Sequence, residues 1–117
     1  MNIEEYRAHC LKKKATTEGF PFDDVVLAFK VAGKVFALTN VEVFESINLK
    51  CDPEKAIELR ETYNGVQPGY HMNKKHWNTV RVDSDVPDEL LYELIDHSYE
   101  LVVQSLTKKI RNEYALG

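Results

Sequence analysis

A chain of 117 residues is long enough for one hydrophobic core, so we predict a single domain over residues 1–117. Hydrophobic residues make up 44% and charged residues 29%, a balance that excludes intrinsic disorder. The net charge of −4 argues against a general nucleic-acid binder, and no apolar run or basic leader indicates a membrane or secreted protein. The expected location is cytoplasmic, where Cys10 and Cys51, lacking a CxxC pair, would be reduced core residues.

The first predicted element is a helix from Asn2 to about Lys14. Asn2 followed by Glu5 resembles a capping box. Apolar residues recur behind it at helical spacing, namely Ile3, Tyr6, Cys10 and Leu11. The lysines at 12–14 favour the helix C-terminus and are interpreted as a solvated last turn rather than a binding patch.

A β-hairpin is predicted next, after a turn at residues 16–19. The segments 25–31 and 35–39 alternate apolar and polar residues, as half-buried strands do. Gly33 and Lys34 suit a two-residue type II′ turn, which takes glycine at its first central position. In that register Val31 faces Phe36 and Phe29 faces Leu38, all four on one buried face, while Lys30 and Ala37 lie on the other.

The remaining chain predicts a strand at 43–50, a helix opened by Asp52 and Pro53 and stopped at residues 64–65, a strand at 77–82, and a long helix from Pro87 to about Ile110. The order is therefore α-β-β-β-α-β-α. Strands grouped in this way indicate an α+β fold, with an antiparallel sheet and helices packed on one face.

Charge is segregated along the second half of the chain. Residues 66–82 carry three cations and two histidines without any acid, whereas residues 83–100 carry seven acids without lysine or arginine. We interpret the acidic segment as a solvated helix face and predict no metal site. The solvent face of the sheet should collect Lys30, Asn48, Lys50, Trp77, Thr79 and Arg81. Trp77 there is either a packing cap or a recognition residue.

The segment from 68 to 80 reads PGYHMNKKHWNTV and resembles the signature of the MmcQ/YjbR family. The resemblance extends to FPF at 20–22, FKVAGKVFAL at 29–38, NLKCDP at 48–53 and DHSYELV at 96–102. Members are small bacterial proteins described as DNA-binding, with a double-wing motif and a fold similar to that of CyaY, the bacterial frataxin. The resemblance therefore implies a CyaY-like fold and no catalytic residue.

The resemblance and the residues together favour weak, salt-dependent DNA binding. The hairpin around Gly33 would be one wing and the loop before the fourth strand the other. Lysines would contact phosphates, amides would contact phosphates or base edges, and rings would stack on bases. The predicted nucleic-acid-binding residues are Lys34, His71, Asn73, Lys74, Lys75, His76, Trp77, Asn78 and Arg81.

Three alternatives stay open. A protein-interaction adaptor could dock through the polar sheet face around Trp77 and Arg81, since both residue types are enriched at interfaces. A small enzyme could use His71 or His76, although no nucleophile is paired with either. Tyr70, Met72 and Trp77 could simply close one end of the core. No cofactor, metal or membrane partner is predicted. The oligomeric state is open, with a monomer favoured.

Overall fold

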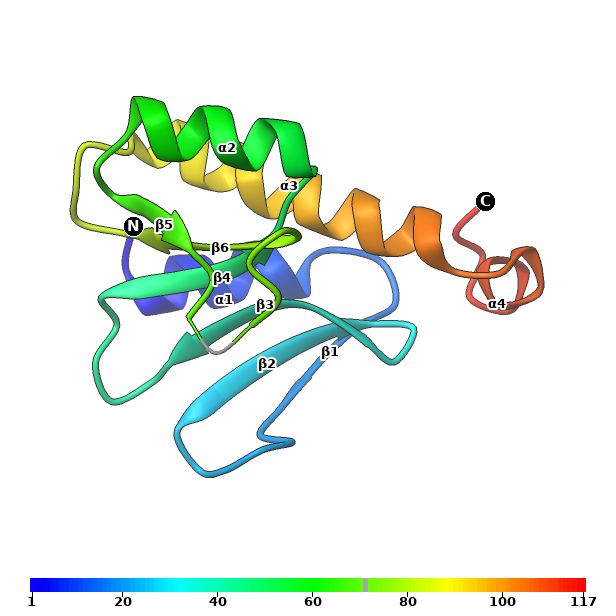
Figure 1. Cartoon of the computed structure of the whole chain (residues 1–117). Helices are drawn as coiled ribbons and strands as arrows, with labels where there is room; N and C mark the ends of the chain where they lie inside the picture. The colour runs from blue at the N-terminus through cyan, green and yellow to red at the C-terminus, as the bar shows by residue number, and fades with distance from the viewer. Residues whose placement is uncertain (71) are drawn as a thin grey trace.

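A computed structural model describes residues 1–70 and 72–117. Six strands form one antiparallel sheet, in the order β1-β2-β3-β4-β6-β5, with helices over one face (Figure 1). The elements are α1 (Ile3–Leu11), β1 (Thr16–Gly19), β2 (Val26–Val31), β3 (Lys34–Asn40), β4 (Ser46–Lys50), α2 (Pro53–Thr62), β5 (Val66–Pro68), β6 (Trp77–Arg81), α3 (Asp88–Ser105) and α4 (Lys108–Glu113). The predicted α+β class and antiparallel sheet are confirmed, while the predicted element order lacked β1, β5 and α4.

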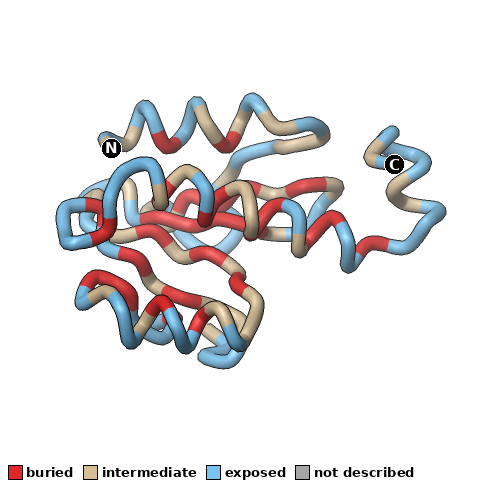
Figure 2. The backbone as a smooth tube through the Cα atoms, turned by 90° about the horizontal axis from the view of Figure 1, so that it is seen from above, coloured by how far each residue is buried: buried red, intermediate tan, exposed pale blue. Residues whose placement is uncertain are grey.

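The core lies between the sheet and helices α1, α2 and α3. Tyr6 of α1 meets Phe29 of β2 edge to face at 5.5 Å, and Tyr99 of α3 meets Phe36 of β3 at 5.3 Å. The Ser98 hydroxyl of α3 donates to the Phe36 carbonyl at 2.6 Å, which satisfies a polar group inside this core. Figure 2 shows the buried segments gathered in the middle of the molecule, with exposed segments around them.

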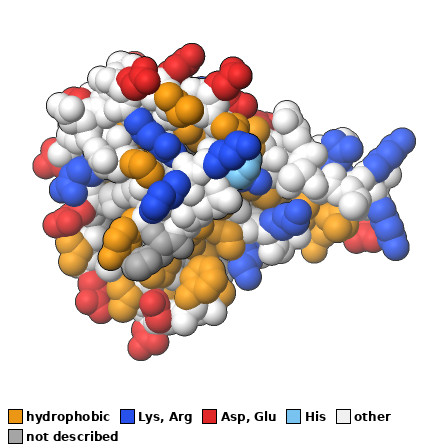
Figure 3. All heavy atoms as spheres, viewed as in Figure 1, with side chains coloured by type: hydrophobic (Ala, Val, Ile, Leu, Met, Phe, Trp, Pro, Cys, Tyr) orange, Lys and Arg blue, Asp and Glu red, His pale blue; other side chains and the backbone are white. Residues whose placement is uncertain are grey.

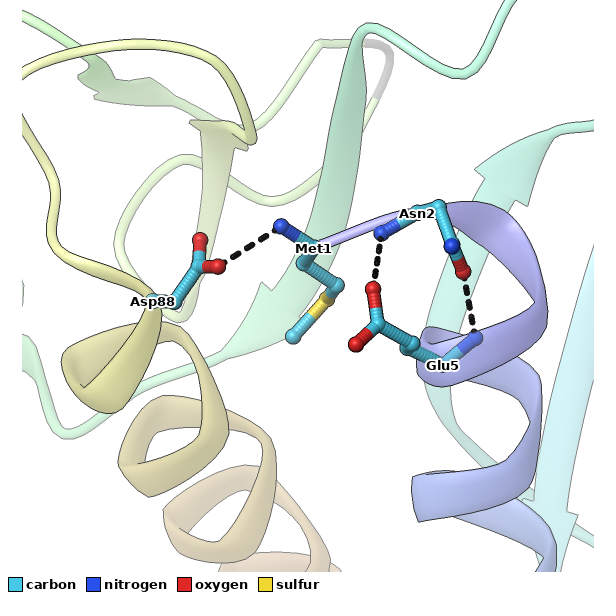
Figure 4. A network of polar contacts seen from close by, with 4 residues as sticks. All are labelled: Met1, Asn2, Glu5 and Asp88. Atoms are coloured by element: carbon cyan, nitrogen blue, oxygen red, sulfur yellow. Dashed lines mark hydrogen bonds and ion pairs between the residues drawn. The ribbon is translucent and has the colours of Figure 1, made fainter.

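The predicted capping box at the start of α1 is confirmed. The Asn2 side chain accepts from the Glu5 N–H at 2.8 Å, and the Glu5 carboxylate accepts from the Asn2 N–H at 2.9 Å (Figure 4). The Met1 ammonium pairs with Asp88 at 2.8 Å, so the starts of α1 and α3 lie side by side. The helix ends at Leu11, earlier than predicted, because Ala15 turns the chain toward β1 with a positive φ of 60°.

The prediction of a turn at residues 16–19 is wrong, because these residues form the edge strand β1. Thr16 pairs with Val31 and Gly19 with Ala28, in antiparallel register. The side chain of Glu18 accepts two hydrogen bonds from Arg7 of α1. A four-residue edge strand has too few residues to show alternation, so its partner strand defines it rather than its own pattern.

The hairpin turn is also one residue earlier than predicted. Val31 pairs with Lys34, so the central residues are Ala32 and Gly33, with φ values of 48° and 85°. Two positive φ values are typical of a type I′ turn, which takes glycine at its second central position. Glycine suits both turn types, and the type II′ turn predicted from the sequence is wrong.

A β-bulge then changes the predicted facing of β3. Phe29 pairs with Ala37 and Lys30 pairs with Val35, which leaves Phe36 as the extra residue of the bulge. Phe36 and Ala37 are both buried in the helix-covered core. Leu38, predicted there, pairs instead with Asn48 on the opposite, outer face of the sheet.

The later elements match their predictions more closely. Asp52 caps α2 through its side chain and Pro53 occupies the first turn. Ile47 and Leu49 of β4 are buried, as is Val80 of β6. The predicted helix from 87 to 110 is broken, because α3 ends at Ser105 and the side chain of Thr107 caps the separate helix α4.

Both cysteines are core residues, as predicted. Burial raises the pKa of the Cys10 thiol to about 12 and that of the Cys51 thiol to about 11. Both thiols therefore remain protonated at neutral pH, and the thiolate needed for nucleophilic or redox chemistry is scarce.

His97 of α3 should make stability depend on pH. Its Nε2 accepts from the Asp52 N–H at 3.2 Å, so the ring must be neutral at that nitrogen. Burial, and then the charge of Lys55, lower the pKa of His97, against an opposing effect of Asp52. A folded-state pKa below the unfolded value of about 6.5 gives stability that is present above that value and lost as pH falls through the folded pKa.

We therefore expect the melting temperature to decrease from about pH 7 to about pH 5. His97→Gln supplies an amide oxygen as acceptor without a titrating ring, so its melting temperature should decrease less over the same range. Equal slopes for the two proteins would show that the decrease comes from other groups.

Candidate nucleic-acid interface

The loop of residues 69–76, between β5 and β6, contains most of the predicted binding residues. Asn73 closes a turn in its second half, because its Oδ1 accepts from the N–H groups of Lys75 at 2.9 Å and His76 at 3.3 Å. Asn73, Lys74 and Lys75 are exposed, and His76 is half-buried. Asn73 therefore shapes the turn that carries the two exposed lysines, and the Lys74 ammonium also donates to the Gly69 carbonyl at 3.3 Å.

Arg60 of α2 holds this turn against the sheet. Its Nε donates to Asn78 Oδ1 at 2.7 Å, and its guanidinium also donates to the backbone carbonyls of Lys74 and Trp77. A planar guanidinium with five N–H donors can serve several acceptors at once. Sequence analysis missed Arg60, since an arginine on an amphipathic helix is ordinarily solvated and its spacing shows no link to the loop.

Gly69 and Tyr70, at the start of the loop, are held against β6. Gly69 donates from its N–H to the Trp77 carbonyl at 2.8 Å, and Tyr70 donates from its N–H to Thr79 Oγ1 at 3.0 Å. A Cβ at Gly69 would lie 2.8 Å from the Cβ of Trp77 and 3.0 Å from its carbonyl oxygen. Only glycine leaves room for this close approach.

The two predicted wings lie at the same end of the sheet. We call residues 31–34 the hairpin wing and residues 69–76 the loop wing. Ala37 pairs with Leu49, so the hairpin wing lies beyond the end of β4. Lys50, the last residue of β4, pairs with Trp77, which directly follows the loop wing. Only β4 separates the strands that carry the two wings, a spacing of about 10 Å across two strand intervals.

One predicted binding residue is buried, another lies at the far end of the sheet, and a third lies outside the described residues. Asn78 is 2% exposed, faces the helices, and its amide oxygen accepts from Arg60, so its predicted contact with nucleic acid is wrong. Arg81 is exposed but lies at the far end of β6, about 13 Å along the strand from Trp77. His71 is the residue outside the described ranges.

The predicted polar sheet face is present. Thr79 Oγ1 donates to Asn48 Oδ1 at 2.5 Å across β4 and β6, and the alternation of both strands adds Lys50, Trp77 and Arg81 to that face. Trp77 is half-buried there beside Lys50. The alternative in which Tyr70 helps to close the core is wrong, because Tyr70 is 70% exposed.

Opposite charges gather at opposite ends of the sheet. Lysines 34 and 50 and the two lysines of the loop wing mark one end. Acids occupy the segments that follow or join strands at the other end, namely Asp23, Asp24, Glu42, Glu45, Asp83 and Asp85. Figure 3 shows acidic side chains around the left rim and basic side chains toward the centre and right. A protein with a net negative charge thus presents a local basic surface.

Within residues 1–70 and 72–117, no group of three or more His, Cys, Asp or Glu side chains could hold a metal ion. No helix in these ranges is long and apolar enough to cross a bilayer.

Fold and site together define a small α+β protein with a helix-covered antiparallel sheet and a double-loop basic end. The YjbR family model matches residues 11–101, and the chain belongs to the YjbR family. The uncharacterized protein YjbR of Escherichia coli (strain K12) is 35% identical over 112 residues, covering 95% of each chain. The uncharacterized protein YbdF of Escherichia coli O157:H7 is 41% identical over 91 residues, covering 77% of this chain and 75% of its own.

Two solved structures share the fold. The crystal structure of the Deinococcus radiodurans protein DR2400 has a TM-score of 0.92 and 41% identity, covering 97% of this chain and 88% of its own. A crystal structure of a Pseudomonas syringae protein has a TM-score of 0.74 and 28% identity, covering 86% of this chain and 98% of its own.

Proposed function

We propose that the protein is a non-enzymatic nucleic-acid-binding protein of the cytoplasm, which binds DNA through its hairpin wing and loop wing. The observation that carries this proposal is the common position of the two wings at the basic end of the sheet. Neither wing alone has more than a few cations. Together the wings present Lys34, Lys74 and Lys75 to one ligand, with Lys50 at the end of β4 between them.

The spacing of the wings supports contact with a phosphate backbone. About 10 Å between their strands lets the two loops lie on either side of one nucleic-acid strand. Lysine ammonium groups would contact phosphates, and the half-buried rings of His76 and Trp77 would offer faces for stacking. Asn78 and Arg81 are not part of the proposed nucleic-acid site.

The non-enzymatic part of the proposal is supported by the side-chain contacts. Among the described residues, no hydrogen bond joins a serine or cysteine side chain to a histidine. His9 contacts Asp96 and His97 contacts a backbone N–H, both of which are structural interactions between packed elements.

The test is a titration of the pure protein with duplex and single-stranded DNA at several salt concentrations, followed by Trp77 fluorescence. Four neutralised phosphates should give a slope of log affinity against log salt of about −3 to −4. Non-specific dissociation constants should lie at about 10⁻⁴ to 10⁻⁶ M. The absence of binding to any nucleic acid at low salt would refute the proposal.

Changing Lys74 and Lys75 together to Ala should flatten that slope by about two units, because two phosphate contacts are lost. The fold should remain intact, since exposed lysines rarely contribute more than about 0.5 kcal/mol to stability. The matched control is Lys108→Ala with Lys109→Ala on α4, which removes the same charge from exposed positions outside the wings. If the control variant bound DNA as weakly as the loop variant, with an equally flattened slope, the net charge of the protein and not the loop wing would govern binding.

A further inference from the structure

The outer face of the sheet contains a groove whose lining includes none of the four lysines of the proposed nucleic-acid site. Its volume is about 810 Å³, within the range of ligand sites in proteins. We call it the outer groove, and its apolar lining consists of Phe22, Val26, Leu38, Val43, Tyr70 and Met72. These side chains come from the segment before β2, from β2 and β3, from the segment after β3, and from the loop wing.

Several of these apolar side chains are unusually open to solvent. Phe22 is 67% exposed, Tyr70 is 70% exposed and Val43 is 51% exposed, while Leu38 on the floor is only 5% exposed. Large apolar side chains that cluster around a groove on a soluble domain mark a binding site more often than isolated ones do. The outer groove thus has apolar walls for an apolar group to contact.

The floor of the groove offers hydrogen-bond donors in a fixed orientation. Asn48 Oδ1 accepts from the Thr79 hydroxyl, and Asn40 Oδ1 accepts from the N–H groups of Glu42 at 2.9 Å and Val43 at 3.1 Å. Both amide oxygens are therefore occupied. The Nδ2 groups of Asn40 and Asn48 have no partner among the described residues and can donate to the carbonyls of a bound chain.

The charge around the groove selects the class of ligand. Glu45 lines it, and the exposed acids Asp23, Asp24 and Glu42 belong to the segments that form its walls. Neither lysine nor arginine is among the described residues that line it. Arg81, opposite Ser46 on the same face, and Lys74, whose ammonium donates to the carbonyl of Gly69 next to Tyr70, are two cations against four carboxylates. A phosphate chain would be repelled here, whereas lysine or arginine beside an apolar anchor would be attracted.

We propose that the outer groove binds a peptide segment of a protein partner, with an aromatic or aliphatic anchor between the groove walls and a flanking lysine or arginine beside Glu42 and Glu45. Tyr70 and Met72 of the loop wing form part of the lining of this site, but its acids lie at the opposite end of the sheet from the lysines of the wings. The protein thus has two adjoining binding surfaces of opposite charge. The proposed site also differs from docking through Trp77 and Arg81, because neither residue is among the described residues that line the groove.

The experiment uses a random heptapeptide library displayed on phage and selected against the immobilised full chain. Enriched peptides should combine an aromatic or aliphatic residue with lysine or arginine. One enriched peptide, synthesised and labelled, is then titrated against variants. Phe22→Ser with Val43→Ser should weaken its binding at least tenfold, and so should Glu42→Lys with Glu45→Lys.

Two control variants sit on exposed positions of α2, away from the groove. Ile57→Ser removes an apolar side chain that is 54% exposed, and Glu54→Lys with Glu58→Lys makes the same charge reversal. Both should bind the peptide as the unmodified protein does. Circular dichroism confirms that each variant is folded, and all the substituted side chains are exposed.

Three results would overturn the proposal. One is a selection that enriches no peptide above the bare support. Another is an enriched peptide that binds the groove variants and the control variants equally. The third is an amide NMR titration in which a short thymidine oligonucleotide, rather than the peptide, shifts the signals of Leu38, Asn48 and Thr79.

Discussion

Leu94→Ala should lower the free energy of unfolding by about 2 to 5 kcal/mol, one of the largest effects expected for a single substitution in this protein. Leu94 is 3% exposed on the face of α3 that packs against the sheet. Its removal leaves a cavity that α3, with contacts to β2, β3 and β4, cannot easily close. Urea denaturation with circular dichroism measures the change.

The neighbouring residue provides a matched control. Glu93 precedes Leu94 on the same helix and is exposed, so Glu93→Ala should leave the denaturation midpoint nearly unchanged. If Leu94→Ala denatured at the same urea concentration as Glu93→Ala, the core would not depend on this face of α3.

Arg60→Ala should be the second largest change, at about 1 to 2 kcal/mol. The substitution leaves the buried Asn78 amide oxygen and the carbonyls of Lys74 and Trp77 without the guanidinium. Unpaired buried polar groups cost about 1 to 3 kcal/mol, and hydrogen bonds to a charged donor contribute about 1.5 to 3 kcal/mol. Because the guanidinium is half-buried, the lower part of the combined range is expected.

Arg60→Ala should also lower the local stability of the turn, beyond its effect on the free energy of global unfolding. The N–H groups of His76 and Trp77 donate to the Asn73 carbonyl inside the turn that Arg60 holds. Their hydrogen exchange should accelerate more in Arg60→Ala than that of core amides such as Ile47. DNA affinity should decrease too, although no lysine has been changed, because the loop wing is no longer held in one conformation.

Arg7→Ala is the control for Arg60→Ala, since it removes the same side chain from a surface ion pair. Arg7 is 55% exposed and pairs with Glu18, and such pairs contribute little to stability. A stability loss in Arg7→Ala equal to that in Arg60→Ala would show that the position of the arginine against the loop is unimportant.

The sequence alone determined the parts of the fold that depend on neighbouring residues. The capping box at Asn2, the Asp52 and Pro53 start of α2, and the alternation of Ile47 and Leu49 all follow from local patterns. Such patterns act through hydrogen bonds and side chains within about one turn or one strand. The family resemblance was likewise carried by contiguous motifs, and the family model confirms it.

Strand pairing depended on contacts that local patterns do not contain. The strands β1 and β5 have four and three residues, too few to show alternation, and their partner strands define them. The bulge at Phe36 moved Leu38 to the outer face, where it forms part of the floor of the groove. One extra residue in a strand reverses its side-chain facing, because the period of a strand is two.

The candidate sites show the same division. The chain itself contains the acid-free run with Lys74 and Lys75, so the sequence could locate the loop wing. Only the tertiary structure shows that the loop wing lies at the same end of the sheet as Lys34. It also shows that Asn78 is buried against Arg60 and that Arg81 lies at the acidic end. The physical reason is that the sequence does not show at which end of the sheet a charged side chain lies. The strand register decides which charged side chains share an end of the sheet. The combined charge at each end determines the electrostatic field that a ligand meets.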